Sequence, residues 1–193
     1  MKLEKEIVKR FDQISELISK TLDENLEKLK LASEKIAQCI QEGGKIFFFG
    51  NGGSASQAQH FSAEFVNRMI LERRPLPAIA LTTDTSILTS ISNDRSFEQV
   101  FVLQLKALAK PGDIAVGLST SGSSKNVILA LQEAKKLGLW RLGFAGKPGA
   151  PIGEVADLCL WVNSDSVPRI QEVHLLFGHI LCEMVERILF GEK

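Results

Sequence analysis

The amino-acid sequence predicts an α/β protein, a doubly wound five-stranded parallel sheet with a long helical extension at its N-terminus. Two observations support this prediction. Five short segments are apolar on consecutive residues, as strands are when helices cover both faces of their sheet, and helical patterns separate them. Before the first such segment, apolar residues recur at helical spacing through residues 2–42. At 193 residues, we expect the whole chain, 1–193, to form one domain.

Residues 2–42 form the predicted N-terminal extension. We leave open whether this is one helix or two helices with a break near Thr21. A helix this long finds little to bury against on a small sheet, so we expect residues 1–42 to pack against copies of themselves in an oligomer. The alternative is that the helix only caps its own domain. The apolar stripe consists of Ile7, Phe11, Ile14, Ile18, Leu22, Leu26, Leu29, Ile36 and Ile40.

Residues 45–193 alternate between predicted strands and helices and form the α/β core. The strands are expected at 45–49, 77–81, 113–118, 140–144 and 158–162. The helices are expected at 54–69, 86–92 followed by 97–109, 124–137 and 169–190. Such alternation implies right-handed crossovers between parallel strands, and ligands then bind beyond the carboxyl ends of the strands.

Composition excludes several classes of protein. The 23 basic and 23 acidic residues give a formal net charge of zero, which argues against nucleic acid or an anionic membrane as a partner held by bulk electrostatics. No apolar run is long enough to span a membrane, and the N-terminus lacks a signal-peptide core, so we expect a cytoplasmic protein. Cys39, Cys159 and Cys182 are too widely spaced for a cysteine zinc site and are expected to be buried, reduced thiols.

The segment after the first strand is the most informative part of the chain. Glycines in the loop 50–54 let the backbone approach a ligand closely, and the start of the next helix offers free N–H groups to an anion. His60 and Glu64 then stand one helical turn apart on one face. That spacing suits a shared metal or a shared substrate.

The run STSGSS at residues 119–124 follows the third predicted strand and precedes a helix. Its hydroxyls and backbone N–H groups can surround a phosphate without a cation, although a serine-rich turn with a helix cap has the same composition. The chain has no Walker-type phosphate loop, and a dinucleotide loop is only weakly matched because the expected acidic residue, Glu72, is not at the end of the second strand.

The predicted C-terminal helix carries Gln171, His174 and His179. We expect His174 to be a hydrogen-bonded core residue. Gln171 and His179 are eight residues apart, about 12 Å along a helix axis and roughly 80° around it. For both to reach one small site, their side chains must converge or a second subunit must contribute.

Taken together, four stretches resemble the phosphoheptose isomerases, within the sugar isomerase (SIS) domain superfamily. They are GNGGSASQAQHFSAEFVNR, LPAIALTTDTSILTSISND, GLSTSGSSKNVILAL and VPRIQEVHLLFGHILCEMVER. The resemblance implies a flavodoxin-like SIS fold and a homotetramer with sites at subunit interfaces. It also implies conversion of D-sedoheptulose 7-phosphate to D-glycero-D-manno-heptose 7-phosphate, the first step toward ADP- or GDP-heptose for lipopolysaccharide-type sugars.

The resemblance also implies residue roles. An enediolate mechanism needs a base and an acid, which we expect to be Glu64 and His179. One zinc ion per subunit is expected at His60, Glu64, Gln171 and His179. Several family members carry Asp where this chain has Gln57, so Gln57 is left out of the site. The residues expected to bind substrate are Asn51, Gly52, Gly53, Glu64, Asn93, Asp94, Ser119, Thr120, Ser121, Ser124 and Gln171.

Two other functions remain open from the sequence. Some relatives of the same fold are tetrameric adaptors that bind the bacterial replication initiator and have lost acid–base residues. A sugar-phosphate sensor would keep the serine loop but would need neither Glu64 nor His179. Because this chain keeps His60, Glu64 and His179 together, an enzyme is favoured.

Overall fold

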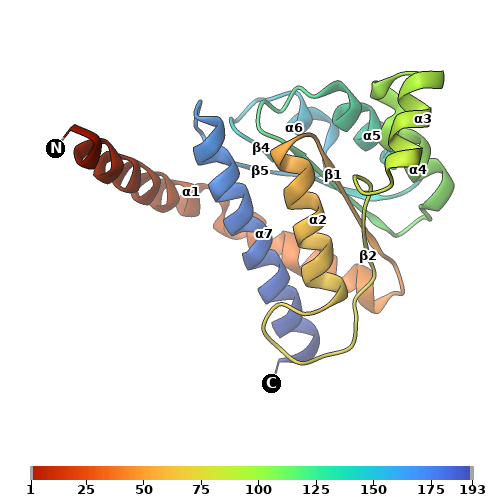
Figure 1. Cartoon of the computed structure of the whole chain (residues 1–193). Coiled ribbons are helices and arrows are strands. Elements are labelled where there is room, and N and C mark those ends of the chain that lie inside the picture. Colours follow the sequence, from red (N-terminus) through yellow and green to blue (C-terminus); the bar gives the residue numbers. More distant parts are fainter. Residues whose placement is uncertain (1, 192–193) are drawn as a thin grey trace.

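A computed structural model describes residues 2–191 and contains one five-stranded sheet (Figure 1). The strands lie in the order β2-β1-β3-β4-β5, and every neighbouring pair is parallel. This order confirms the predicted doubly wound, flavodoxin-like sheet. The strand bounds agree with the predicted ones to within one residue: β1 (Ile46–Gly50), β2 (Ala78–Ala80), β3 (Ile114–Ser119), β4 (Trp140–Ala145) and β5 (Leu158–Trp161).

Helices cover both faces of the sheet. One face carries α1 (Lys2–Gln41), α2 (Gly53–Val66) and α7 (Val167–Phe190). The other carries α3 (Thr85–Asp94), the 3-10 turn η1 (Phe97–Gln99), α4 (Val100–Leu108), α5 (Lys125–Lys136) and α6 (Ile152–Val155). The prediction missed α6, because four residues are too few to show a helical period.

Strand β1 contributes side chains to the hydrophobic cores on both faces of the sheet. Successive side chains of a strand point to opposite faces. Phe48 accordingly packs with α1, α2 and α7, whereas Phe47 and Phe49 pack with α4 and α5 on the opposite face. All five residues of β1 are buried, as the continuous apolar run predicted.

Helix α1 is one continuous helix of 40 residues, and the break considered near Thr21 is absent. The Thr21 hydroxyl instead donates to the carbonyl of Val162, at 3.3 Å. One turn later, the amide of Asn25 donates to the Trp161 carbonyl at 2.9 Å and accepts from the Trp161 N–H at 3.2 Å. Asn25 is fully buried, so α1 is joined to the backbone of the outermost strand, β5, where a break had been considered.

The N-terminal half of α1 projects away from the rest of the protomer (Figure 1). Its large apolar side chains are exposed, among them Leu3, Ile7 and Phe11. Farther along, α1 and α7 border an apolar hollow of about 460 Å³ that includes Leu22, Leu26, Leu29, Ile180, Met184 and Ile188. No helix within residues 2–191 is both long enough and apolar enough to cross a membrane.

Candidate active site

The loop after β1 brings α2 close to α7. Gly52 has a φ of 55°, a left-handed conformation that glycine adopts at little cost. Gly53 lies close to α7, because a Cβ there would be 2.3 Å from the nitrogen at the end of the flexible Gln171 side chain. Gly53, Gln57, His60 and Glu64 are spaced by four, three and four residues, so they form one stripe along α2. That stripe faces α7.

The imidazoles of His60 and His179 meet where α2 and α7 lie side by side. Their Nε2 atoms are 2.8 Å apart, so one imidazole donates to the other. A carboxylate oxygen of Glu64 lies 3.6 Å from Nε2 of His60. The side chain of His60 is 44% exposed and that of Glu64 is 21% exposed, which leaves the group open to a ligand. The structure therefore brings together three residues that the sequence placed in two distant segments.

The donor types at this group are those that zinc prefers, namely two imidazole nitrogens and a carboxylate oxygen. The separation of the two nitrogens is instead that of a hydrogen bond. Two nitrogens on one tetrahedral zinc, each about 2.0–2.1 Å from the metal, lie roughly 3.3 Å apart. Within residues 2–191, no three His, Cys, Asp or Glu side chains are already arranged as a metal cluster. The chemistry of the donors fits zinc, whereas the rotamers are those of a hydrogen-bonded pair.

Gln171 does not join this group within the protomer. Its side-chain amide lies against Gly53, seven residues before His60 on α2, and its backbone carbonyl accepts a bond from Nε2 of Gln57 at 2.6 Å. No hydrogen bond between described residues links the Gln171 amide to either imidazole. Gln57, left out of the predicted site, is thus a structural bridge between α2 and α7. Its buried Oε1 has no partner among the described residues.

The serine loop closes on itself beyond the carboxyl end of β3. The hydroxyl of Ser119 lies 2.9 Å from that of Ser124 and 3.3 Å from that of Ser121. Ser124 is the N-cap residue of α5, yet its hydroxyl does not bond the first turn of that helix. The serine hydroxyls are therefore not used as the ordinary helix cap that was the alternative explanation. The Asn126 side chain accepts from the first-turn N–H of Val127 at 3.0 Å, and the N–H groups of Lys125 and Asn126 remain available to an anion.

Asn126 is a site neighbour that the sequence analysis missed. Its side-chain amide exchanges two hydrogen bonds with that of Asn51, at 2.9 and 2.8 Å. This pair joins the glycine loop after β1 to the start of α5. Asn126 is buried, and its position two residues after the serine loop was the only sequence signal.

Asn93 and Asp94 are not brought to these loops within the protomer. They were expected to follow a short helix, but they form the last turn of α3 and are exposed. The Asn93 amide donates to the Asp94 carboxylate at 2.8 Å, and within residues 2–191 no hydrogen bond ties either residue to the loops after β1 or β3. Their assignment as substrate ligands stays a prediction.

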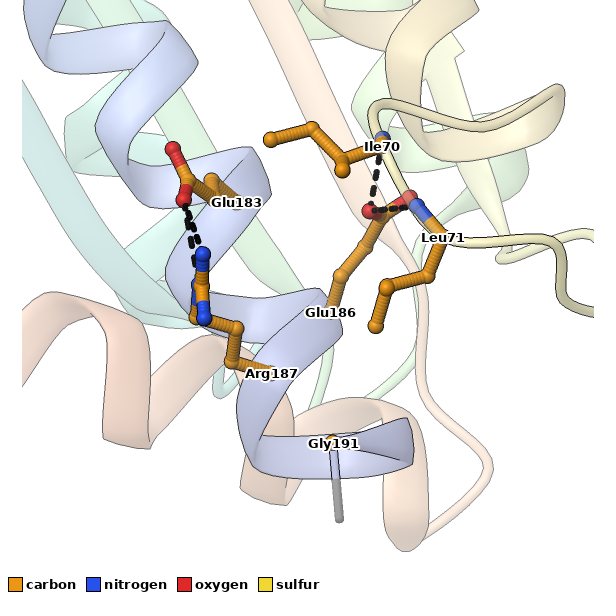
Figure 2. A pocket seen from close by; sticks show the side chains of 6 residues that line it. All are labelled: Ile70, Leu71, Glu183, Glu186, Arg187 and Gly191. Carbon is orange, nitrogen blue, oxygen red and sulfur yellow. Dashed lines mark hydrogen bonds and ion pairs between the residues drawn. The ribbon is translucent and has the colours of Figure 1, made fainter.

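Of two hollows on the protein surface, one borders the predicted site and the other does not. One of about 260 Å³ is bordered by Thr120 and Ser121 and by the ion pair of Lys147 with Asp165. Another of about 370 Å³ lies at the C-terminal end of α7, beside Ile70 and Glu186 (Figure 2). Only the first contains residues that the sequence assigned to substrate.

The remaining histidine and the cysteines are core residues, as expected. His174 is fully buried, and its Nε2 lies 3.1 Å from the carbonyl of Ala145. Burial lowers the pKa of His174 to about 4. Cys39, Cys159 and Cys182 are free and buried, and burial raises the pKa of each thiol, so all three are poor nucleophiles at neutral pH.

Comparisons with known proteins show the family of this chain. Residues 10–146 match the SIS domain family. The phosphoheptose isomerase of Thermodesulfovibrio yellowstonii is 48% identical over 190 residues, covering 98% of this chain and 94% of that protein. The phosphoheptose isomerase of Roseiflexus sp. is 49% identical and covers 90% and 88%.

Solved structures give the same result. The phosphoheptose isomerase of Neisseria gonorrhoeae superposes with a TM-score of 0.90 at 38% identity, covering 95% of this chain and 98% of that one. The enzyme of Francisella tularensis superposes with a TM-score of 0.92 at 34% identity, covering 97% and 99%.

Proposed function

The chain belongs to the SIS-domain phosphoheptose isomerases, and from this premise we propose that it converts D-sedoheptulose 7-phosphate to D-glycero-D-manno-heptose 7-phosphate. The observation that carries the proposal is the meeting of His60, Glu64 and His179 on two facing helices. An adaptor or a sensor has no use for such a group. We therefore assign it to acid–base chemistry on the sugar.

Glu64 is the proposed base. It removes a proton from C1 of the ketose and returns it to C2, through an enediolate. His179 is the proposed acid–base partner, which gives a proton to O2 and takes one from O1. The side chains of His60 and Glu64 are both partly exposed, which leaves space for C1 and C2 of the sugar beside them.

The serine loop is the proposed phosphate site. Ser119, Ser121 and Ser124 offer hydroxyls, and the N-terminus of α5 offers N–H groups and a favourable dipole. The Asn51 side chain bonds that of Asn126 just after this loop, and Gly53 begins α2. His60 lies about 10 Å farther along α2. An extended seven-carbon sugar phosphate can span this interval.

Zinc remains part of the proposal, with His60, Glu64, His179 and Gln171 as the residues that would hold it. When bound, the ion supplies Lewis-acid polarisation of the two sugar oxygens. Binding requires both imidazoles to be neutral. Gln171 is about 12 Å along α7 from His179, so in this proposal the Gln171 ligand comes from a second subunit. Zinc content measured by mass spectrometry, in the wild type and in His60→Ala, tests this assignment without reference to turnover.

A homotetramer is the proposed assembly. The exposed apolar side chains of α1 and the hollow between α1 and α7 have no partner within the described protomer. Contiguous apolar surface of this kind is typical of an interface between subunits. A second copy could also bring Asn93 and Asp94, or another Gln171, to the His60–His179 pair.

The direct test is an isomerase assay on sedoheptulose 7-phosphate with Glu64→Gln as the comparison. We expect the wild type to turn over substrate and the variant to bind sugar phosphate as a tetramer without turnover, because an amide cannot accept the C1 proton. Gln59→Glu, on an exposed position of the same helix, is the control. Full turnover by Glu64→Gln would refute the choice of base.

A further inference from the structure

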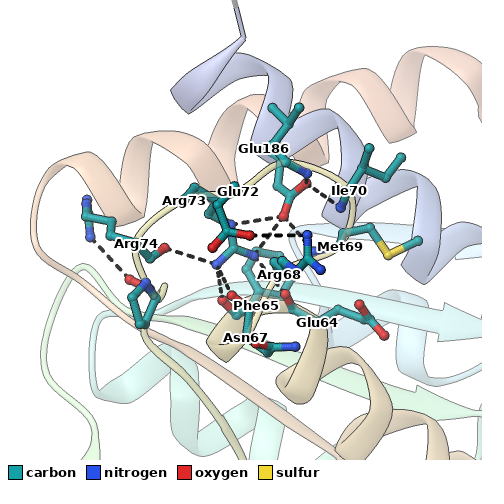
Figure 3. Close-up of polar contacts among 12 residues, drawn as sticks. Glu64, Phe65, Asn67, Arg68, Met69, Ile70, Glu72, Arg73, Arg74 and Glu186 are labelled. Carbon is teal, nitrogen blue, oxygen red and sulfur yellow. Dashed lines mark hydrogen bonds and ion pairs between the residues drawn. The ribbon is translucent and has the colours of Figure 1, made fainter.

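A buried ion pair lies where the C-terminal ends of α2 and α7 meet (Figure 3). It joins Arg73, in the loop after α2, to Glu186 on α7, with an N–O distance of 2.9 Å. The two side chains are only 2% and 1% exposed. Removing charges from water costs more than a single contact returns, so a pair this deeply buried must be supported by further hydrogen bonds.

Glu186 receives those bonds from the loop. Its two carboxylate oxygens accept the backbone N–H groups of Met69, Ile70 and Leu71 at 2.6 to 3.0 Å. The same carboxylate accepts Nε–H of Arg73 at 2.9 Å. The loop after α2 is thereby wrapped around one carboxylate that belongs to α7.

Arg73 bonds in the opposite direction, to the end of α2. Its guanidinium donates to the carbonyl of Glu64 at 2.7 Å, to that of Phe65 at 2.7 Å and to that of Asn67 at 3.0 Å. The last carbonyls of a helix have no partner within the helix, and cations are favoured there. The last turn of α2 has no basic residue of its own, so Arg73 supplies the missing cap.

The capped turn is the one that carries Glu64. Glu186, at the other end of the pair, lies seven residues after His179 on the same side of α7, about 10 Å along the helix. The ion pair thus connects the backbone of the proposed base to the helix of its proposed partner. At the opposite end of the two helices, Gln57 bonds the backbone of Gln171.

We propose that Arg73 and Glu186 are positioning residues for the isomerase reaction, which fix Glu64 relative to His179 by clamping the end of α2 to α7. This inference rests on the proposed function of Glu64. The clamp touches no substrate. It acts by holding the last turn of α2 in its helical conformation, so the base stays within reach of the carbon that it deprotonates.

The experiment compares Arg73→Lys and Glu186→Gln with Arg74→Ala and Glu183→Gln. Lysine keeps the charge of Arg73 but cannot reach the helix carbonyls and Glu186 together. The two control residues lie next to the clamp and are partly or fully exposed. We expect kcat of the clamp variants to fall by about 10- to 100-fold, as for a small displacement of a catalytic group. We expect KM to change by less than about threefold, since the phosphate site is elsewhere.

Three readouts separate positioning from stability. Turnover is measured per folded subunit, well below the unfolding temperature of each variant. Hydrogen exchange should become faster in residues 61–67 of the clamp variants and remain unchanged in 171–179. Arg73→Ala should regain kcat when guanidinium ion is added, because the ion can replace the contacts of the deleted side chain with Glu186 and the carbonyls of α2. Wild type and Glu64→Gln should show no such gain.

The outcomes are distinguishable. An inactive wild type, or an active Glu64→Gln, would overturn the proposed function. An active wild type with an inactive Glu64→Gln, but with clamp variants at the kcat of the controls, would overturn the positioning role alone. If Arg73→Lys and Glu186→Gln lower the unfolding temperature yet keep kcat per folded subunit, the pair only stabilises the fold and our inference is wrong.

Discussion

Acidification should destabilise this protein through His174, the buried histidine of α7. Its Nε2–H donates to the carbonyl of Ala145, and its Nδ1 is buried without a partner among the described residues. A second proton would therefore be placed on Nδ1 with no acceptor, beside the ring of Phe144 at 5.4 Å. Burial is the main reason why the pKa of His174 falls to about 4.

The size of the effect follows from linkage between protonation and folding. In the unfolded chain His174 titrates near its ordinary pKa of about 6.5. Between that value and about pH 4 the unfolded state binds a proton that the native state does not, so stability falls as the pH falls. The full difference is about 3 kcal/mol, of which about 2 kcal/mol is already lost at pH 5 relative to pH 7.5.

The assay is urea unfolding at fixed protein concentration from pH 7.5 to pH 4.5, for the wild type and for His174→Gln. The variant is less stable at pH 7.5, because glutamine fills the site poorly, but it lacks the titrating group. Its free energy of unfolding should therefore decline less with acid, by about 2 kcal/mol at pH 5. Parallel curves for the two proteins would refute the reasoning, since they would show that His174 can be protonated in the native state.

Other perturbations have equally definite outcomes. Gly178→Ala should cost about 1–3 kcal/mol in urea unfolding, because its Cβ would lie 2.0 Å from the Phe61 ring; unchanged stability would contradict the close approach of α2 and α7. Burial alone would raise the pKa of Glu186, but three backbone N–H groups and Arg73 outweigh it and lower that pKa. The stability that the Glu186 carboxylate contributes should therefore be lost only below about pH 4.3, and the free energy of unfolding of Glu186→Gln should not show this loss. Leu22→Lys with Leu26→Lys should convert the proposed tetramer to smaller species in sedimentation, and an assembly unaltered by these changes would place the interface elsewhere. Chelation should lower activity and added zinc should restore it, whereas full activity in metal-free protein would leave the metal without a catalytic role.

Local periodicity was enough to predict the sheet and its principal helices. Strand β1 reads as four apolar residues followed by glycine, and α7 repeats its apolar residues at helical spacing, so both are encoded locally. The continuity of α1 at Thr21 could not be predicted in this way. It depends on contacts with Val162 and Trp161, which are distant in the sequence.

The candidate site was predictable only in part, for the same reason. His60 and Glu64 share a helix turn, so their pairing is visible in the sequence, and the meeting of His60 with His179 was expected from resemblance. Asn126 and the Arg73–Glu186 clamp depend on tertiary contacts with no local pattern. Arg73 sits in a charged stretch that reads as ordinary solvated surface, yet its side chain is almost completely buried.

The side chain of Asn25 has a consequence for the solution behaviour of the protein. An outermost strand offers unpaired backbone groups that can recruit a strand from another molecule. The Asn25 side chain forms hydrogen bonds with both the N–H and the carbonyl of Trp161, so these two edge groups cannot pair with another strand. Replacing Asn25 by leucine would keep the helix but leave these two backbone groups of β5 unpaired, and would favour open-ended aggregation through that edge.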